Sequence, residues 1–170
     1  MLDGGFTCPN RDGRVGQGGC SFCLCESFNP EYCRKHATIT GQLEAGKKFF
    51  EGKYPQMKYL AYFQAYSSTY APLEVLRQRY DEALAVEDVV GLVVATRPDC
   101  IDDDVLALLA SIRERGYSVA IELGCETFYD RTLARVNRGH TSRQSMDAIH
   151  LCHRYAIPVT VHLMFGLPGE

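Results

Sequence analysis

Three cysteines near the amino terminus have the spacing of metal ligands. Cys8, Cys20 and Cys23 form a C-x11-C-x2-C pattern in a chain of 170 residues. The CxxC half places two thiolates on one tight turn, so both can reach one metal centre. Iron–sulfur clusters are commonly held by four thiolates, so three thiolates leave one iron open. The amino and carboxylate groups of S-adenosylmethionine (SAM) can chelate such an open iron, so the pattern suits a [4Fe–4S] cluster of the kind that SAM chemistry needs.

The spacing alone leaves two other interpretations of these cysteines open. A structural zinc site would take its fourth ligand from Cys25, Cys33 or His36. A thioredoxin-like redox pair is expected next to a βαβ pattern with a helix just after the CxxC, but no obvious helix follows residues 21–25. A zinc-stabilised binding module without catalysis is therefore the alternative to an enzyme.

The composition of the chain is that of an ordinary globular domain. Eight cysteines without a visible export signal indicate a reducing cytoplasm rather than a disulfide framework. The dispersed Cys100, Cys125 and Cys152 are expected to be small buried hydrophobic residues. The net charge of −3 gives no overall signature of nucleic-acid binding. No apolar run approaches the roughly 20 residues that span a membrane, so we expect no membrane association.

Strands alternate with helices after a long loop at residues 1–36. Strands are expected over residues 57–63, 89–95, 118–123 and 159–164, and helices over residues 41–51, 72–85, 102–115, 131–136 and 142–155. The apolar run at 89–95 is typical of a strand buried on both faces. Thr40 is the expected N-cap of the first helix, and Asp102 begins an acidic run that favours the start of the third. The alternation predicts an α/β fold with parallel βαβ units.

Both ends of the chain have the pattern of an interrupted fold. Leu2 and Asp3 would suit the end of a strand, and residues 165–170 form a turn after a strand, where a helix is expected next. We therefore expect residues 1–170 to form one domain, a barrel fragment that lacks its first strand and its carboxy-terminal part.

Six segments, in order and at plausible spacing, resemble a bacterial radical SAM family of the YhcC/YtqA type. That family is similar to the radical SAM domain of the Elongator catalytic subunit. The segments are DGGFTCPNRDGRVGQGGCSFC (3–23), AYFQAYSSTYAPLEVLR (61–77), GLVVATRPDC (91–100), IELGCET (121–127), VNRGHT (136–141) and HLMFGLPGE (162–170). The resemblance covers nearly the whole chain and implies a partial parallel (β/α)6 radical SAM barrel. SAM is then expected across the carboxyl ends of the strands, where α/β folds bind ligands.

The resemblance also implies a role for particular residues. It makes Cys8, Cys20 and Cys23 the ligands of the [4Fe–4S] cluster. The residues that it implies for SAM binding are Phe22, Gln64, Tyr66, Arg97, Glu122, Gly166 and Gly169. Four of these have structural alternatives. Phe22 can be an ordinary core residue and Tyr66 a packing residue, whereas Arg97 can pair with Asp99 and Glu122 can cap a neighbouring helix. Cys125 and Glu126 depart from the family pattern, which places Leu and Gln there.

The function that the resemblance implies is radical chemistry. A reduced cluster, supplied with electrons by a donor such as flavodoxin or ferredoxin, cleaves SAM to a 5′-deoxyadenosyl radical that takes hydrogen from a substrate. Elongator-like relatives act on wobble uridines, so tRNA is the leading substrate. The alternative substrate is a small metabolite or a peptide.

A local excess of basic residues is the candidate contact surface for tRNA phosphates. The cluster lies within thirteen positions and consists of Arg131, Arg135, Arg138, His140 and Arg143. The alternative is a solvated helical face with local ion pairs, in which His140, like His162, has a structural role.

Overall fold

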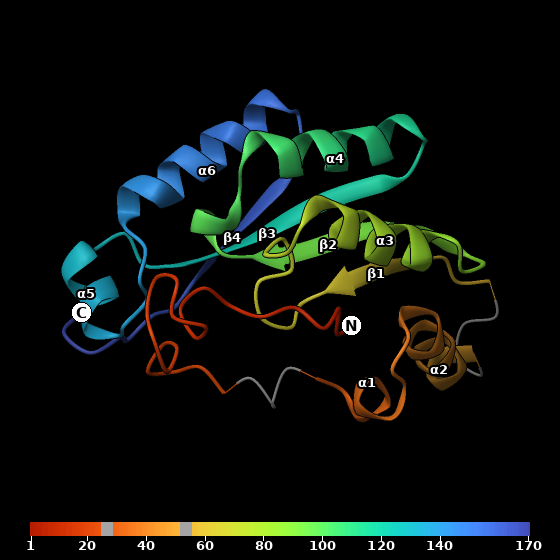
Figure 1. The fold of residues 1–170 in the computed structure, drawn as a ribbon, viewed down its shortest axis with the longest axis horizontal. Coiled ribbons are helices and arrows are strands. Elements are labelled where there is room, and N and C mark those ends of the chain that lie inside the picture. The colour runs from red at the N-terminus through yellow and green to blue at the C-terminus, as the bar shows by residue number, and fades with distance from the viewer. Residues whose placement is uncertain (25–28, 52–55) are drawn as a thin grey trace.

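The computed structural model describes residues 1–24, 29–51 and 56–170, which form a parallel sheet with helices on one face (Figure 1). The strands are β1 (Tyr59–Phe63), β2 (Val89–Thr96), β3 (Ser118–Glu126) and β4 (Val159–Leu163). The helices are α1 (Glu31–Lys35), α2 (Ile39–Glu51), α3 (Leu73–Leu84), α4 (Asp103–Glu114), α5 (Asp130–Arg135) and α6 (Ser142–Arg154), and Pro98–Cys100 form a 3₁₀ turn. The strand order β1-β2-β3-β4 follows the chain, and every pairing is parallel, so the predicted α/β architecture with βαβ units is confirmed.

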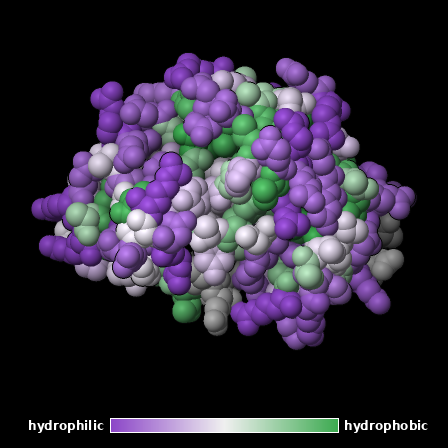
Figure 2. Space-filling view, viewed as in Figure 1, coloured by the Kyte–Doolittle hydropathy of each residue, from purple (hydrophilic) through white to green (hydrophobic). Residues whose placement is uncertain are grey.

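Helices α3, α4 and α6 cover one face of the sheet (Figure 1). Along β3, Val119, Ile121 and Leu123 are buried in the core, whereas the alternate residues, including Glu122, are only half-buried. This period of two is that of a strand with one packed face. In the view of Figure 2 the outer surface is largely hydrophilic, with hydrophobic atoms in small groups between polar side chains.

The prediction that strand 89–95 is buried on both faces is wrong. Val90 is 39% exposed, and Val93 and Ala95 are half-buried. Only the helix-covered face of β2 is packed, because the opposite face of the sheet looks toward a cavity that Ala95 lines.

The start of one helix differs from the sequence prediction, and one short helix was not predicted. Helix α2 begins at Ile39, and Thr38, not Thr40, supplies the cap: its hydroxyl accepts from the Gly41 amide at 3.0 Å. Thr40 instead donates to Glu82 on α3. The short helix α1 was not predicted and interrupts the expected loop at residues 1–36.

Residues at the amino terminus lie along the outer edge of β1. The Leu2 amide donates to the Tyr62 carbonyl at 2.7 Å, and Leu2 forms a parallel bridge with Phe63. The strand-like character expected of Leu2 is therefore confirmed. Residues 4–24, which we call the cysteine loop, consequently leave from the carboxyl edge of the sheet. None of the helices in the described ranges is long and apolar enough to cross a membrane.

Asp102, the first residue of the acidic run expected at the start of this helix, caps α4, and this cap is testable. Its carboxylate accepts from the Val105 amide at 2.8 Å. Replacing Asp102 with Ala is expected to lower the free energy of unfolding by about 1 kcal/mol, because a first-turn amide loses its partner. Urea denaturation measures this loss. Asp104→Ala is the matched control in the same turn, and an equal loss in both variants would contradict the capping role.

Candidate functional site

A cavity of about 360 Å³ lies where the cysteine loop meets the carboxyl ends of the strands. Its volume is within the range of small-molecule sites. Eight of the ten predicted site residues line it, namely Cys8, Cys20, Phe22, Cys23, Gln64, Tyr66, Arg97 and Glu122. Gly166 and Gly169 do not line it. The sheet polarity thus brings together side chains that are up to 114 positions apart in the sequence.

All three predicted ligand cysteines face this cavity. Cys20 is buried, and Cys8 and Cys23 are half-buried. Among the described residues, no three His, Cys, Asp or Glu side chains stand close enough to hold a single metal ion. One Zn²⁺ binds every sulfur at about 2.3 Å and requires close thiolates, whereas the ligands of a four-iron cluster each bind a different iron.

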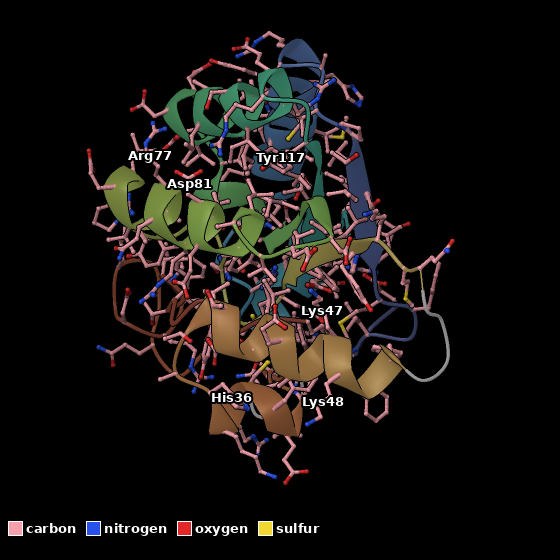
Figure 3. The ribbon with its side chains drawn as sticks, turned by 90° about the vertical axis from the view of Figure 1, so that its right-hand side faces the viewer. His36, Lys47, Lys48, Arg77, Asp81 and Tyr117 are labelled. Carbon is pink, nitrogen blue, oxygen red and sulfur yellow. The ribbon has the colours of Figure 1, made fainter. Side chains whose placement is uncertain are left out.

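The fourth ligands considered for zinc lie elsewhere. The Cys33 thiol contacts the Met1 carbonyl at 3.5 Å. His36 lies beside α2 and lines a separate cavity with Lys47 and Lys48 (Figure 3). Cys25 lies outside the described residues.

The prediction that the three dispersed cysteines are buried is confirmed for two of them. Cys125 and Cys152 are fully buried core residues, and Cys100 is half-buried. Burial raises the pKa of the Cys152 thiol to about 11 and that of Cys100 to about 12. These thiols therefore stay protonated at neutral pH and are poor metal ligands.

Residues 136–140 anchor the cysteine loop over the strand ends. The Val136 carbonyl accepts from the Ser21 amide at 2.9 Å, and the Asn137 side chain donates to the Gly19 carbonyl at 2.8 Å. Gly139 has a φ of +80°, and a Cβ there would lie 2.8 Å from the side-chain oxygen of Asn10. Glycine at 139 therefore permits both the turn and the close approach of the loop.

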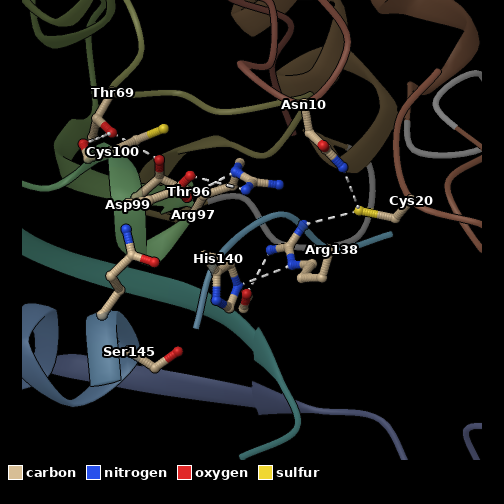
Figure 4. A network of polar contacts seen from close by, with 12 residues as sticks. Asn10, Cys20, Thr69, Thr96, Arg97, Asp99, Cys100, Arg138, His140 and Ser145 are labelled. Carbon is tan, nitrogen blue, oxygen red and sulfur yellow. Dashed lines mark hydrogen bonds and ion pairs between the residues drawn. The ribbon is translucent and has the colours of Figure 1, made fainter. Parts of the chain in front are cut away.

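Polar side chains donate to two of the three sulfurs, and Figure 4 shows the two donors to Cys20. Arg138 Nη1 lies 3.4 Å and Asn10 Nδ2 3.6 Å from the Cys20 sulfur. Arg11 Nη1 lies 4.0 Å from the Cys23 sulfur. Sequence reasoning missed these donors. Their only signals were that Asn10 and Arg11 closely follow Cys8 and that Arg138 belongs to the VNRGHT segment.

Arg97 pairs with Asp99, which is one of the two roles that the sequence left as alternatives, and it also lines the cavity. It is 2% exposed and forms a two-fold contact with Asp99, at 2.8 and 2.9 Å. Its third nitrogen, Nη1, is buried without a hydrogen-bond partner among the described residues. A buried donor left unsatisfied is costly, and Arg97 lines the cavity, so Nη1 suits an anionic or carbonyl group placed there.

Glu122 connects two other strands on the open face of the sheet. The Tyr62 hydroxyl on β1 donates to Glu122 Oε2 at 2.6 Å, and His162 Nε2 on β4 lies 3.0 Å from the same oxygen. Burial, and then the hydrogen bond to Glu122, raise the pKa of Tyr62, so its hydroxyl keeps its proton and donates. The three side chains form a polar row that lines the cavity.

The predicted basic surface is wrong for Arg138 and His140, which are buried. The other arginines have separate partners. Arg131 and Arg135 donate to the carbonyls of Gly169 and Pro168, and Arg143 pairs with Asp147. Local charge density did not reveal this division, because Arg131 and Arg135 lie on α5, Arg138 in the turn that follows it, and Arg143 on α6.

Gly166 and Gly169 belong to the turn after β4 and have φ of +78° and +94°. A Cβ at Gly169 would meet the Arg135 guanidinium, so glycine allows that arginine to approach. Their predicted contact with adenine remains a prediction.

Comparisons with known proteins agree with this geometry. The sequence model of the Radical SAM superfamily matches residues 8–170. The chain is 46% identical over 169 residues to YhcC of Escherichia coli K12. This match covers 99% of this chain and 53% of YhcC. It is 41% identical over 169 residues to YtqA of Bacillus subtilis, and this match covers 99% of this chain and 52% of YtqA.

More distant matches include a tRNA-modifying enzyme. Identity to the tRNA uridine(34) acetyltransferase of Methanocaldococcus jannaschii is 35% over 82 residues, covering 48% of this chain and 14% of that protein. The structure of the archaeal Methanocaldococcus infernus Elp3 matches with a TM-score of 0.60 at 20% identity, covering 78% of this chain and 34% of that one. Together with the superfamily match over residues 8–170, this likeness in fold confirms the predicted partial radical SAM barrel. The chain spans about half the length of the curated relatives YhcC and YtqA.

His140 gives the folding stability of the chain a testable dependence on pH. Its Nε2 accepts from Arg138 Nε at 3.1 Å, and burial, followed by the charge of Arg138, lowers the pKa of His140 to about 4. The unfolded chain, with a His pKa near 6.5, takes up a proton first as the pH falls. Folding stability is therefore expected to decline by up to roughly 3 kcal/mol between about pH 6.5 and pH 4, and not above that window.

Urea denaturation at several pH values measures this effect. His140→Gln, which can still accept from Arg138, is expected to remove that part of the pH dependence. The exposed His153→Gln is the matched control. An unchanged pH slope in the His140 variant would show that His140 titrates normally.

Proposed function

The chain belongs to the radical SAM superfamily, and from this we propose that it is an enzyme of tRNA wobble-uridine modification whose cluster is held by Cys8, Cys20 and Cys23. A [4Fe–4S] cluster and SAM are the cofactors of this class. The observation that carries the proposal is the convergence of the three cysteines on one cavity at the carboxyl edge of a parallel sheet.

The residues around the cavity suit both cofactors. Three thiols can bind three irons and leave the fourth iron open to SAM. Arg97 offers a buried donor without a partner among the described residues, which fits a carboxylate or a carbonyl oxygen. The chemistry that the cofactors supply when bound is the one-electron cleavage of SAM, which yields an adenosyl radical able to take hydrogen from a substrate. Flavodoxin or ferredoxin is the proposed electron donor.

The chain's own side chains position and enclose the cofactor. We assign Phe22 to the adenine ring, because it lines the cavity within the CxxC turn. Gln64 and Tyr66 follow β1 and face the same space, where they can accept from or donate to the polar end of SAM. Glu122 is held by Tyr62 and His162, so its carboxylate is oriented in advance for a ribose hydroxyl.

The substrate proposal rests on relatives rather than on a surface. One relative is named a tRNA uridine(34) acetyltransferase, and the matched part is 82 residues long. The basic surface expected from the sequence does not support the proposal, since Arg138 is buried. A small metabolite or a peptide remains the second candidate, because the cavity itself is of small-molecule size.

Cluster ligation is tested by removing one cysteine at a time. Replacing Cys8, Cys20 or Cys23 with Ala is expected to abolish the iron–sulfur absorption of the anaerobically reconstituted protein, because two thiolates hold a cluster poorly. The control replacements Cys25→Ala, Cys33→Ala, Cys100→Ala, Cys125→Ala and Cys152→Ala are expected to keep about four irons per chain. Loss of iron in a control variant would overturn the three-ligand assignment.

The substrate is tested by anaerobic incubation with SAM, a reductant and tRNA, followed by mass analysis of the nucleosides. A mass change at uridine that requires SAM and an intact Cys20 is the expected result. SAM cleavage without any change in tRNA would retain the radical enzyme and favour a small substrate instead. A zinc-bearing, colourless protein without SAM cleavage would reject both.

A further inference from the structure

Arg138 is a buried cation with every nitrogen engaged. Nη1 donates to the Cys20 sulfur at 3.4 Å, and Nε donates to His140 Nε2 at 3.1 Å. Nη2 donates to the Gly124 carbonyl and lies 3.3 Å from Glu126 Oε1. The Arg138 side chain is 9% exposed. A surface arginine would be free to change partners, whereas this guanidinium has one orientation fixed by four groups.

Neutral His140 secures that orientation. Because Nε2 accepts from Arg138, the imidazole proton lies on Nδ1, which faces the Thr141 carbonyl at 3.3 Å. A guanidinium is always charged in proteins, so a permanent positive charge is held against Cys20. Salt screens a buried charge less than an exposed one. The field of this charge therefore acts on whatever the Cys20 sulfur binds.

Glu126 is the counter-charge of Arg138. Its side chain is 13% exposed and lines the same cavity. A Cβ at Gly124 would lie 2.8 Å from both Arg138 Nη2 and Glu126 Oε1. A side chain at position 124 would therefore displace one or both of these charged groups at the cavity wall.

We propose that Arg138 is a positioning residue that raises the reduction potential of the cluster through Cys20, and that Glu126 offsets part of its charge. This inference rests on the proposed ligation by three cysteines. Reduction adds negative charge to the cluster, and a cation or a hydrogen bond at a ligand sulfur favours the reduced form. A carboxylate at the same wall has the opposite effect. The sequence suggested a phosphate contact for Arg138, and burial beside Cys20 gives it a different role.

The test is a redox titration of the anaerobically reconstituted protein, followed by electron paramagnetic resonance of the reduced cluster. Arg138→Gln is expected to lower the reduced fraction at a fixed potential roughly tenfold, which corresponds to about 59 mV for one electron. Glu126→Gln is expected to raise that fraction, and the double variant is expected to lie near the unmodified protein. The matched control is Arg143→Gln, whose exposed side chain pairs with Asp147 and is expected to leave the potential unchanged.

The outcomes separate this inference from the proposed function. If the unmodified protein takes up no cluster, the proposed function fails first. If it does take one up and both single variants keep its potential, the role of Arg138 is rejected while the function stands. Shifts of the same sign in both variants would indicate general loosening of the loop and would also reject it. If Arg138→Gln loses its iron, Glu126→Gln decides alone, and an unchanged or lowered potential overturns the inference.

Discussion

The contact between residues 136–140 and the cysteine loop is the interaction on which the site depends. The sheet fixes where the strands end, but it does not bring Cys8, Cys20 and Cys23 to one place. That depends on a loop with little regular structure, whose backbone is bound by Val136 and Asn137. An irregular segment of this length loses much conformational entropy on ordering, and these few hydrogen bonds offset part of that loss. A substitution at Asn137 or Gly139 would therefore disturb the placement of the cysteine loop directly.

The sequence was sufficient for the fold because its periodic signals are local. The apolar runs of the four strands and the acidic start of α4 predicted their elements to within a few residues. The cavity was predictable for a related reason, since parallel strands carry their following loops on one edge. Glu122 and Arg97 therefore reached the cavity as expected. The error at Thr40 was also local, because Thr38 and Thr40 are both acceptable N-caps and only the helix path decides between them.

Tertiary placement of charged side chains was not predictable in the same way. Arg135, Arg138 and Arg143 look alike in the sequence, yet their contacts differ. Arg135 donates to the Pro168 carbonyl in a turn, Arg138 is buried against the Cys20 sulfur, and the exposed Arg143 forms an ion pair with Asp147. What separates them is the left-handed turn at Asn137 and Gly139, which directs Arg138 inward. Arg138 contacts Cys20, which is 118 positions away in the chain, and a contact at that separation leaves no periodic signal in the sequence. The NRGH run showed that a tight turn was there, but not which side of it faced the sulfurs.

The charges around the cavity give a reason why arginines accompany these cysteines. A thiolate, not a thiol, is the ligand form, and burying anions without compensation is costly. The chain carries a net charge of −3, yet Arg11, Arg97 and Arg138 all line this cavity. In the proposed ligation, these cations offset the negative charge that three thiolate ligands bring to the cavity. By the inference drawn above, Arg138 also favours the electron that reduces the cluster, so one arrangement would serve both the assembly of the site and its redox chemistry.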